Sequence, residues 1–368
     1  MQTPRREIEL DFLRGIAILV VLDFHFAPRL EYLGRASVLF YPLQWIGIPH
    51  FGWAGVDIFF VLSGFLVGGL LIKERLTHGR IAPGRFLIRR AFKIWPQYYF
   101  FLAVIVALHP HWFGTLRGNL LNIQNYTGTP LEHTWSLAVE EHFYLLLIVI
   151  LVLAVATHLR TRTLSIVLAI MAAAVTVHRV ISIYRGNQGL YLTHMRIDAL
   201  LFGVLLALAY HHRPELFTRL QRPRWLLPLV PAVAILSTHF QSPLAVSLGI
   251  FAADLSGVAL LLLCYRHCPH KGPVYRFVAW IGLYSYGIYL WHESVLGPTS
   301  KIAAHLPHTA GAVFLSIAPW IFAIGLGVLT TNLIESPSLR LRDRLFPRRV
   351  DSAAGTPAIS EVHTPTTN

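Results

Sequence analysis

The chain has 368 residues, of which 55% are hydrophobic and only 13% are charged. This balance excludes an ordinary soluble domain, because soluble chains carry about 25% charged residues. The net charge of +13 at pH 7 does not indicate nucleic acid as a partner, since most of the 31 basic residues are spread over the segments outside the apolar runs, where they also face anionic membrane lipid.

Long apolar runs recur along the chain and predict about ten membrane-spanning helices, because a helix of roughly 20 residues crosses the hydrocarbon core. With an even number of spans and both termini in the cytoplasm, most basic residues fall in inner loops, as the positive-inside rule requires. The fold expected over residues 1–349 is therefore one all-α, polytopic transmembrane helix bundle. The predicted spans are residues 10–27, 51–73, 92–108, 140–157, 163–183, 198–210, 226–239, 243–265, 275–296 and 310–335.

The first predicted span, DFLRGIAILVVLDFHFA, carries Arg14 near its start and His25 near its end. That spacing corresponds to three helical turns plus about 20°, so the two side chains share a face and lie roughly 16 Å apart along the axis. Ionisable groups within a span are costly and usually face a cavity. We expect Arg14 at the cytoplasmic edge and His25 at the outer edge of one functional face; a packed interfacial histidine is the alternative for His25.

The second predicted span, with the sequence FGWAGVDIFFVLSGFLVGGLL, places Asp57 near its outer end. Ser63 lies about 9 Å deeper at the helical rise. Gly64 and Gly68 form a face of small residues, which favours close packing against another helix.

Four basic residues, Arg85, Arg89, Arg90 and Lys93, cluster at the inner start of the third predicted span. Arg85 and Arg89 are neighbours on a helix surface. Guanidinium groups suit phosphate, which indicates an anionic ligand on the cytosolic side. A topology signal in a basic inner loop is the alternative.

Further polar and ionisable residues gather at the outer ends of later spans. They are His133, Glu140 and Glu141 in HTWSLAVEEHFY, Arg196 and Asp198 in MRIDALLFG, and His292 and Glu293 in YSYGIYLWHE. The two glutamates could instead be solvated acids at a helix N-terminus, where the macrodipole favours them. Together with the basic cluster on the inner side, the pattern predicts that an anionic donor substrate binds on the cytoplasmic side and that acid–base chemistry takes place on the outer side of the membrane.

Neither the cysteines nor the C-terminal segment indicates a metal or a second domain. Cys264 and Cys268 lie at the predicted cytoplasmic end of the eighth span and lack the usual partners of a zinc site, so we expect no metal. The tail, residues 350–368, is polar and rich in Ser, Thr and Pro, and we expect it to be disordered in the cytoplasm.

Taken in order, these motifs resemble the membrane acyltransferase-3 family over about residues 8–345. Family versions of the third-span cluster often end in arginine where this chain has Lys93. The matching elements are Arg14 and His25, the VDIFFVLSGFL stretch, Arg89 and Arg90 ahead of Trp95 and Pro96, HTWSLAVEEHFY, RIDALLFG, YSYGIYLWH, and Glu335-Ser336-Pro337.

The resemblance implies an integral membrane O-acyltransferase in the inner membrane of a bacterium. It would move an acyl group, most often acetyl, from cytosolic acetyl-CoA or another acyl-CoA to a hydroxyl of a carbohydrate or glycosylated acceptor. His25 would be the general base, because imidazole titrates near neutral pH, with Glu140 or Asp57 as the carboxylate that orients its ring. Arg14, Arg85, Arg89, Arg90 and Lys93 would hold the coenzyme A phosphates. The residues expected to bind substrate are Ser63, His133, Glu141, Arg196, Asp198 and His292.

Two other functions use a similar set of residues. A proton-coupled secondary transporter also needs intramembrane acids, histidines and arginines, but it usually has two similar halves, which this sequence lacks. A flippase for a lipid-linked sugar would need no thioester donor. An acyl-enzyme at Ser63 is less attractive, because the G-x-S-x-G elbow is missing. The sequence leaves open the acceptor, the acyl length, the oligomeric state and the role of Asp254.

Overall fold

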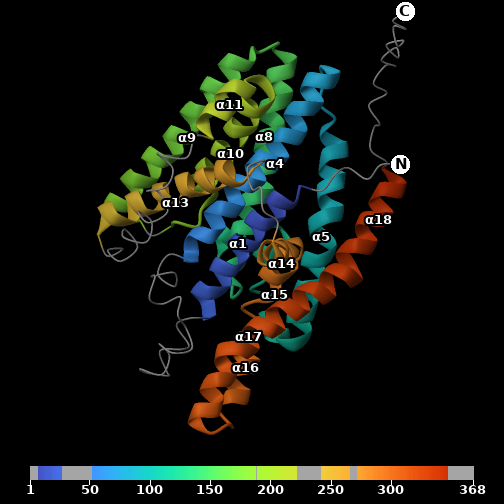
Figure 1. Ribbon diagram of the computed structural model, residues 1–368, viewed down its shortest axis with the longest axis vertical. Coiled ribbons are helices and arrows are strands. Elements are labelled where there is room, and N and C mark those ends of the chain that lie inside the picture. Colours follow the sequence, from blue (N-terminus) through green and yellow to red (C-terminus); the bar gives the residue numbers. More distant parts are fainter. Residues whose placement is uncertain (1–6, 27–51, 188, 222–241, 266–271, 347–368) are drawn as a thin grey trace, which may run out of the picture.

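The computed structural model describes residues 7–26, 52–187, 189–221, 242–265 and 272–346, and the statements below concern those ranges. Every regular element within them is helical, which confirms the predicted all-α class (Figure 1). The longer helices are α1 (Ile8–Phe26), α4 (Gly55–His78), α5 (Pro83–Leu108), α8 (Trp135–Ala156), α9 (Thr161–Tyr184), α10 (Thr193–His212), α13 (Pro243–Cys264), α14 (Pro273–Leu283), α17 (His308–Thr330) and α18 (Ser336–Leu345). The shorter elements are η3 (Gly52–Ala54), η4 (Pro110–Trp112), α6 (Arg117–Leu120), α7 (Gln124–Thr127), η5 (Glu132–Thr134), α11 (Pro214–Leu220), α15 (Ser285–Trp291), α16 (Leu296–Ala303) and the π-helical turn η7 (Thr331–Glu335).

Seven helical segments of the described chain are long and apolar enough to cross a membrane, which makes this a polytopic helical membrane protein. Six of the ten predicted spans correspond to single helices of this set, and the tenth corresponds to the continuous segment that begins with α17. The seven segments are Gly52–His78, Pro83–Leu108, Glu132–Ala156, Thr161–Tyr184, Thr193–His212, Pro243–Cys264 and His308–Leu345.

The other three predicted spans do not correspond to any of these seven segments, each for a separate reason. The first corresponds to α1, whose 19 residues include charged side chains at Glu9, Asp11, Arg14 and Asp23. The ninth is divided between the short helices α14 and α15, which meet at Tyr284. The seventh, residues 226–239, lies outside the described residues, as does the tail 350–368. The cytoplasmic placement of both termini stays a prediction.

Two glycines let α4 and α10 pack with their backbones in close approach. A Cβ atom on Gly64 would lie 2.0 Å from the carbonyl oxygen of Leu200, and one on Gly203 would lie 2.2 Å from that of Val61. Gly68 faces Val204 in the same way, with 2.9 Å from its ideal Cβ position to a methyl carbon. The small-residue face predicted for the second span is therefore confirmed as the contact surface with α10.

We expect Gly64→Ala to lower the thermal unfolding midpoint of the detergent-solubilised protein. The new methyl group would meet backbone rather than a movable side chain, and overpacking of this kind typically costs about 1–3 kcal/mol. Gly69→Ala on the same helix is the matched control, since the nearest atom to its ideal Cβ is 3.6 Å away. Equal midpoints for the two variants would contradict the close approach of α4 and α10.

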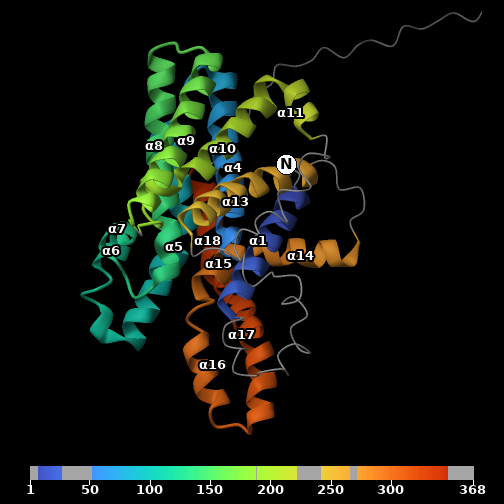
Figure 2. The same ribbon diagram turned by 90° about the vertical axis from the view of Figure 1, so that its left-hand side faces the viewer.

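The remaining helices are arranged around this pair. α8 and α9 extend to one end of the molecule, and the α16–α17 pair extends to the opposite end (Figures 1 and 2). α13 crosses α4 at a steep angle (Figure 2). α1 packs against α14 and α4, and α5 packs against α18 and η7. Residues from α1, α4, α5, α8, α14 and α15 converge between these groups of helices and line a cavity.

Candidate active site

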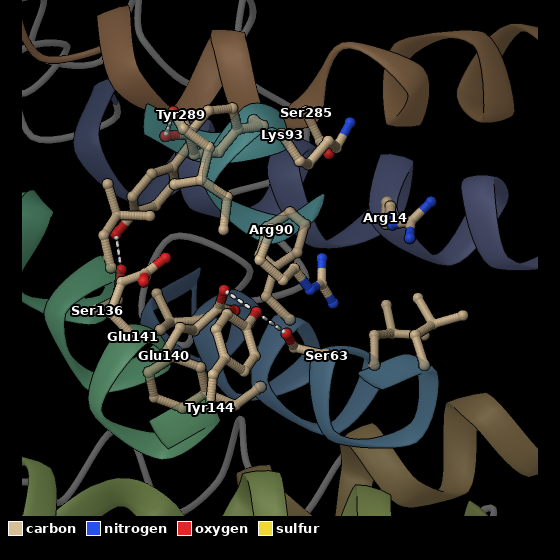
Figure 3. Close-up of a pocket in the computed structure, with 18 of the residues that line it drawn as sticks. Arg14, Ser63, Arg90, Lys93, Ser136, Glu140, Glu141, Tyr144, Ser285 and Tyr289 are labelled. Carbon is tan, nitrogen blue, oxygen red and sulfur yellow. Dashed lines mark hydrogen bonds between the residues drawn. The ribbon is translucent and has the colours of Figure 1, made fainter. Parts of the chain in front are cut away.

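A cavity of about 180 Å³ lies between α1, α4, α5, α8 and the α14–α15 junction. Its wall combines apolar side chains with charged and hydroxyl groups, and Figure 3 shows Arg14 on one side and Ser136 on the opposite side. The polar residues that line it are Arg14, Ser63, Arg90, Lys93, Ser136, Glu140, Glu141, Tyr144, Ser285, Tyr286 and Tyr289.

Three of the five predicted donor-binding cations line this cavity. Arg90 has its guanidinium carbon 4.9 Å from the ring centre of Tyr144, and its Nε atom is buried with no hydrogen-bond partner among the described residues. Arg14 donates a 2.9 Å hydrogen bond to Asp11 one turn earlier. Lys93 contacts the carboxylate of Glu335. Arg90 and Arg14 therefore keep donor groups for a ligand, whereas the charge of Lys93 is largely compensated.

The other two predicted cations do not line the cavity. Arg89 donates to the carbonyl oxygen of Phe346 at 2.7 Å and to the carboxylate of Asp343 at 3.1 Å, so it ties α5 to α18. Arg85 is not among the residues that line the cavity either. Successive helical residues point about 100° apart, which is why Arg90 reaches the cavity and Arg89 does not.

The glutamates of α8 also belong to this cavity. Tyr144 donates a 2.8 Å hydrogen bond to Glu140, and Ser63 lies 2.6 Å from the hydroxyl of Tyr144 (Figure 3). Glu141 lines the same space. Glu140 is thus part of a Ser63–Tyr144–Glu140 chain beside Arg90, and it does not contact the ring of His25.

His25 belongs to a second group, which consists of three histidines and one glutamate. Its Nδ1 lies 2.9 Å from the carbonyl oxygen of Val21, and its Nε2 lies 3.3 Å from Oε1 of Glu293. Oε2 of Glu293 in turn lies 3.0 Å from Nδ1 of His133. The carboxylate that contacts His25 is therefore Glu293, which replaces Glu140 and Asp57 in that predicted position.

His292 completes this histidine cluster. Its ring centre lies 4.8 Å from that of His25 and 5.0 Å from that of His133. Its Nδ1 lies 2.6 Å from the carbonyl oxygen of Tyr289, while its Nε2 is buried without a hydrogen-bond partner among the described residues. By spacing, His25, His292 and Glu293 could also hold a metal ion, since their ligand atoms lie within 4.8 Å of one another.

Tyr289 joins the cavity to the histidine cluster. Tyr289 lines the cavity, and its hydroxyl lies 2.7 Å from Ser136 Oγ and donates a 2.6 Å hydrogen bond to the backbone carbonyl of His133. Its ring centre lies 5.3 Å from that of His292. The space beside Arg90 and the ring of His25 are thus neighbouring parts of one site.

Three predicted site residues lie away from both groups, in an ion network buried among α4, α9, α10 and α13. Arg196 contacts Asp57, and Arg179 contacts Asp198 at 2.7 Å. Arg179 also reaches Asp254 at 3.2 Å, which gives that residue a partner. The structure does not bring Asp57, Arg196 or Asp198 to the cavity.

Glu293 was noted in the sequence among the outer polar residues but was given no role, and Tyr144 and Tyr289 were given none either. Signals for them were present, because Glu293 follows His292 directly, Tyr144 is one helical turn after Glu140, and Tyr289 is one turn before Glu293. Their importance depends on which distant helix each one faces, and local spacing does not show that.

Comparison with known proteins identifies the family of this chain. The acyltransferase domain model matches residues 7–334. The chain is 25% identical over 373 residues to the peptidoglycan O-acetyltransferase OatA of Listeria monocytogenes, covering 89% of this chain and 55% of that protein. It is 25% identical over 378 residues to the putative peptidoglycan O-acetyltransferase YrhL of Bacillus subtilis, with 93% and 56% covered. It is 23% identical over 336 residues to the O-acetyltransferase OatA of Staphylococcus aureus, with 80% and 51% covered.

The chain spans about half the length of these curated relatives. No solved structure matches it. Because the domain model covers most of the sequence, from the start of α1 to the π-helical turn after α17, the chain belongs to the acyltransferase-3 family of membrane O-acyltransferases.

Proposed function

We propose that the chain transfers an acetyl group from cytosolic acetyl-CoA to a hydroxyl of a cell-envelope carbohydrate, in the cytoplasmic membrane of a bacterium. The observation that carries the proposal is the adjacency of two groups: a cavity lined by Arg14 and Arg90, and a histidine–glutamate cluster that contains His25. Tyr289 contacts both. Binding of an anionic thioester donor requires the arginine-lined cavity, and activation of an alcohol requires the histidine–glutamate cluster.

The cavity supports the donor half of this proposal. Guanidinium groups bind phosphate through paired hydrogen bonds, and Arg90 has an unpartnered Nε at the cavity wall. A cavity of about 180 Å³ has room for the narrow thioester end of the donor rather than for its nucleotide. We therefore place the phosphates toward Arg14 and Arg90, and the acetyl group toward Ser136 and Tyr289.

The cluster supports the acceptor half. A carbonyl oxygen only accepts hydrogen bonds, so His25 carries its proton on Nδ1 toward Val21, and its lone pair is on Nε2 beside Glu293. His25 takes the acceptor hydroxyl proton on Nε2, and the adjacent Glu293 carboxylate stabilises the imidazolium that forms. The acceptor oxygen attacks the thioester carbonyl carbon, the carbon–sulfur bond breaks, and the coenzyme A thiolate leaves and receives the proton.

The acceptor class is taken from the relatives, two of which are named as peptidoglycan O-acetyltransferases. We propose a carbohydrate hydroxyl of that kind as the acceptor. The test is transfer of label from radiolabelled acetyl-CoA by the purified protein to peptidoglycan fragments and to lipid-linked sugars. An alkali-labile acetyl ester on a sugar is the expected product; acetyl-CoA binding without any labelled glycan would contradict the acceptor class, and no binding would contradict the donor.

We expect Glu293→Gln to lower kcat by about 10- to 100-fold and to leave the KM for acetyl-CoA unchanged. Glutamine keeps the shape but removes the charge that stabilises the His25 imidazolium, and a hydrogen bond to a charged group contributes about 1.5–3 kcal/mol. Glu132→Gln, at an exposed position beside His133, is the matched control and should leave both parameters unchanged. A Glu293 variant with wild-type kcat would remove this residue from the mechanism.

A further inference from the structure

The buried ion network of α4, α9, α10 and α13 contains more acids than bases. Its members are three aspartates and two arginines, each at most 5% exposed: Asp57, Asp198, Asp254, Arg179 and Arg196. If every group were ionised, the network would carry one uncompensated negative charge inside the membrane. An unpaired buried charge is strongly destabilising.

Asp198 is fully satisfied within this network. Arg179 donates to its Oδ1 at 2.8 Å, and Thr176 donates to its Oδ2 at 2.8 Å. Both of its oxygens therefore have donors, as an ionised carboxylate requires. If a proton neutralises the excess negative charge of the network, Asp198 is therefore not the group that carries it.

Asp57 and Asp254, unlike Asp198, each have only one oxygen with a hydrogen-bond donor within the described part of the chain. Each has one oxygen beside an arginine: Arg196 contacts Oδ1 of Asp57, and Arg179 contacts Oδ2 of Asp254. The remaining oxygens, Oδ2 of Asp57 and Oδ1 of Asp254, are buried and have no donor among the described residues.

The two carboxyl groups belong to facing helices of this one network, in which Arg179 contacts both Asp198 and Asp254 and Arg196 contacts Asp57. α13 approaches α4 closely at this level, since a Cβ on Gly257 would lie 3.4 Å from the carbonyl oxygen of Asp57. Two ionised carboxylates can only accept hydrogen bonds, so the two unpartnered oxygens can satisfy each other only if one of the groups carries a proton. Neighbouring buried acids generally share one proton, because both cannot ionise together.

We propose that Asp57 and Asp254 form a proton-binding site, in which one shared proton joins α4 to α13 and makes the network electrically neutral. The groups that face the pair from the packed helices are Arg179 and Thr176 of α9 and Arg196 and Asp198 of α10, with the ring of Trp135 from α8 lying 5.3 Å from the Arg196 guanidinium. Asp57 is then a helix-joining residue rather than part of the acyl-transfer machinery.

Asparagine at position 254 tests the shared proton directly. Asp254→Asn places an N–H donor where the proton would be and leaves two aspartates opposite two arginines. We expect its thermal unfolding midpoint at pH 7 to equal or exceed that of the wild type. Asp198→Asn is the matched control, because it removes a carboxylate with both oxygens already satisfied; its midpoint should fall. An Asp254 variant that is as unstable as the Asp198 variant, or that fails to fold, would overturn the proposal.

Two further readouts report the proton itself. The infrared carbonyl band of a protonated carboxyl group should be present in wild type and lost in both Asp57→Asn and Asp254→Asn. At neutral pH the folded protein would also hold a proton that the unfolded chain has already released, because unfolded aspartates titrate at about pH 4; wild-type stability should therefore fall more steeply than that of Asp254→Asn as the pH rises. Identical bands and identical pH slopes in wild type and variants would show that both carboxyl groups are ionised, and would sink the proposal.

Discussion

Replacing His25 with glutamine is expected to lower the rate of acetyl transfer by about 100- to 10,000-fold, the range that a positioned general base contributes. Glutamine retains a side-chain donor that can reach the Val21 carbonyl, but it has no basic nitrogen beside Glu293. Binding of acetyl-CoA should be unchanged, because His25 does not line the donor cavity. Single-turnover transfer of labelled acetyl and equilibrium binding of acetyl-CoA measure the two effects separately.

His305→Gln is the control for this variant. The Nδ1 atom of His305 lies 2.8 Å from the carbonyl oxygen of Lys301, four residues earlier, which is the same local contact that His25 makes with Val21. His305 is exposed and does not line the cavity, so its replacement should leave transfer unchanged. Full transfer by a folded His25 variant would exclude His25 as the base and would direct attention to His292, whose buried Nε2 has no partner among the described residues.

Replacing Arg90 with alanine is expected to weaken acetyl-CoA binding by about 10- to 100-fold. This corresponds to the loss of charge-assisted hydrogen bonds to phosphate, which contribute about 1.5–3 kcal/mol. The rate constant at saturating donor should change much less, since Arg90 is placed with the phosphates and not with the reacting carbonyl. Calorimetric titration of the purified variant with acetyl-CoA gives the affinity, and saturation kinetics give the rate.

The adjacent residue provides the control for Arg90. Arg89→Ala removes the same charge from the same helix, but its guanidinium faces Asp343 and the Phe346 carbonyl instead of the cavity. Its donor affinity should therefore stay near wild type. Acetylpantetheine, which lacks phosphate, should bind the Arg90 variant and the wild type equally. Equal loss of acetyl-CoA affinity in both variants would mean that the cluster acts only through its overall positive charge.

The parts of the site that follow from one helix were predictable from the sequence. The close-packing face of Gly64 and Gly68 on α4 is an example, because helical periodicity is a local property. The different positions of Arg89 and Arg90, of which only Arg90 lines the cavity, were not predictable. The sequence does not show which of two adjacent residues faces α8 and which faces α18. The same limit applies to the pairing of Asp57 with Arg196, two residues 139 positions apart.

The ninth predicted span shows a different limit. Its hydropathy is that of a membrane helix, but the chain divides it into α14 and α15 without a proline at the junction. The apolar content of a segment predicts that it is buried in lipid or in the protein interior. It does not predict whether the segment forms one continuous helix. The same division explains why no role was expected for Glu293: after the junction, this residue contacts His25 of α1 and His133 of η5.

α15 is seven residues long, and it carries groups for both halves of the site. Ser285 and Tyr289, one turn apart, line the donor cavity, while His292 and Glu293 follow at its C-terminal end beside His25. In the proposed mechanism, a donor molecule that moves α15 as a whole also moves the carboxylate next to His25, so binding of the thioester and alignment of the group that activates the alcohol would be coupled through this one helix.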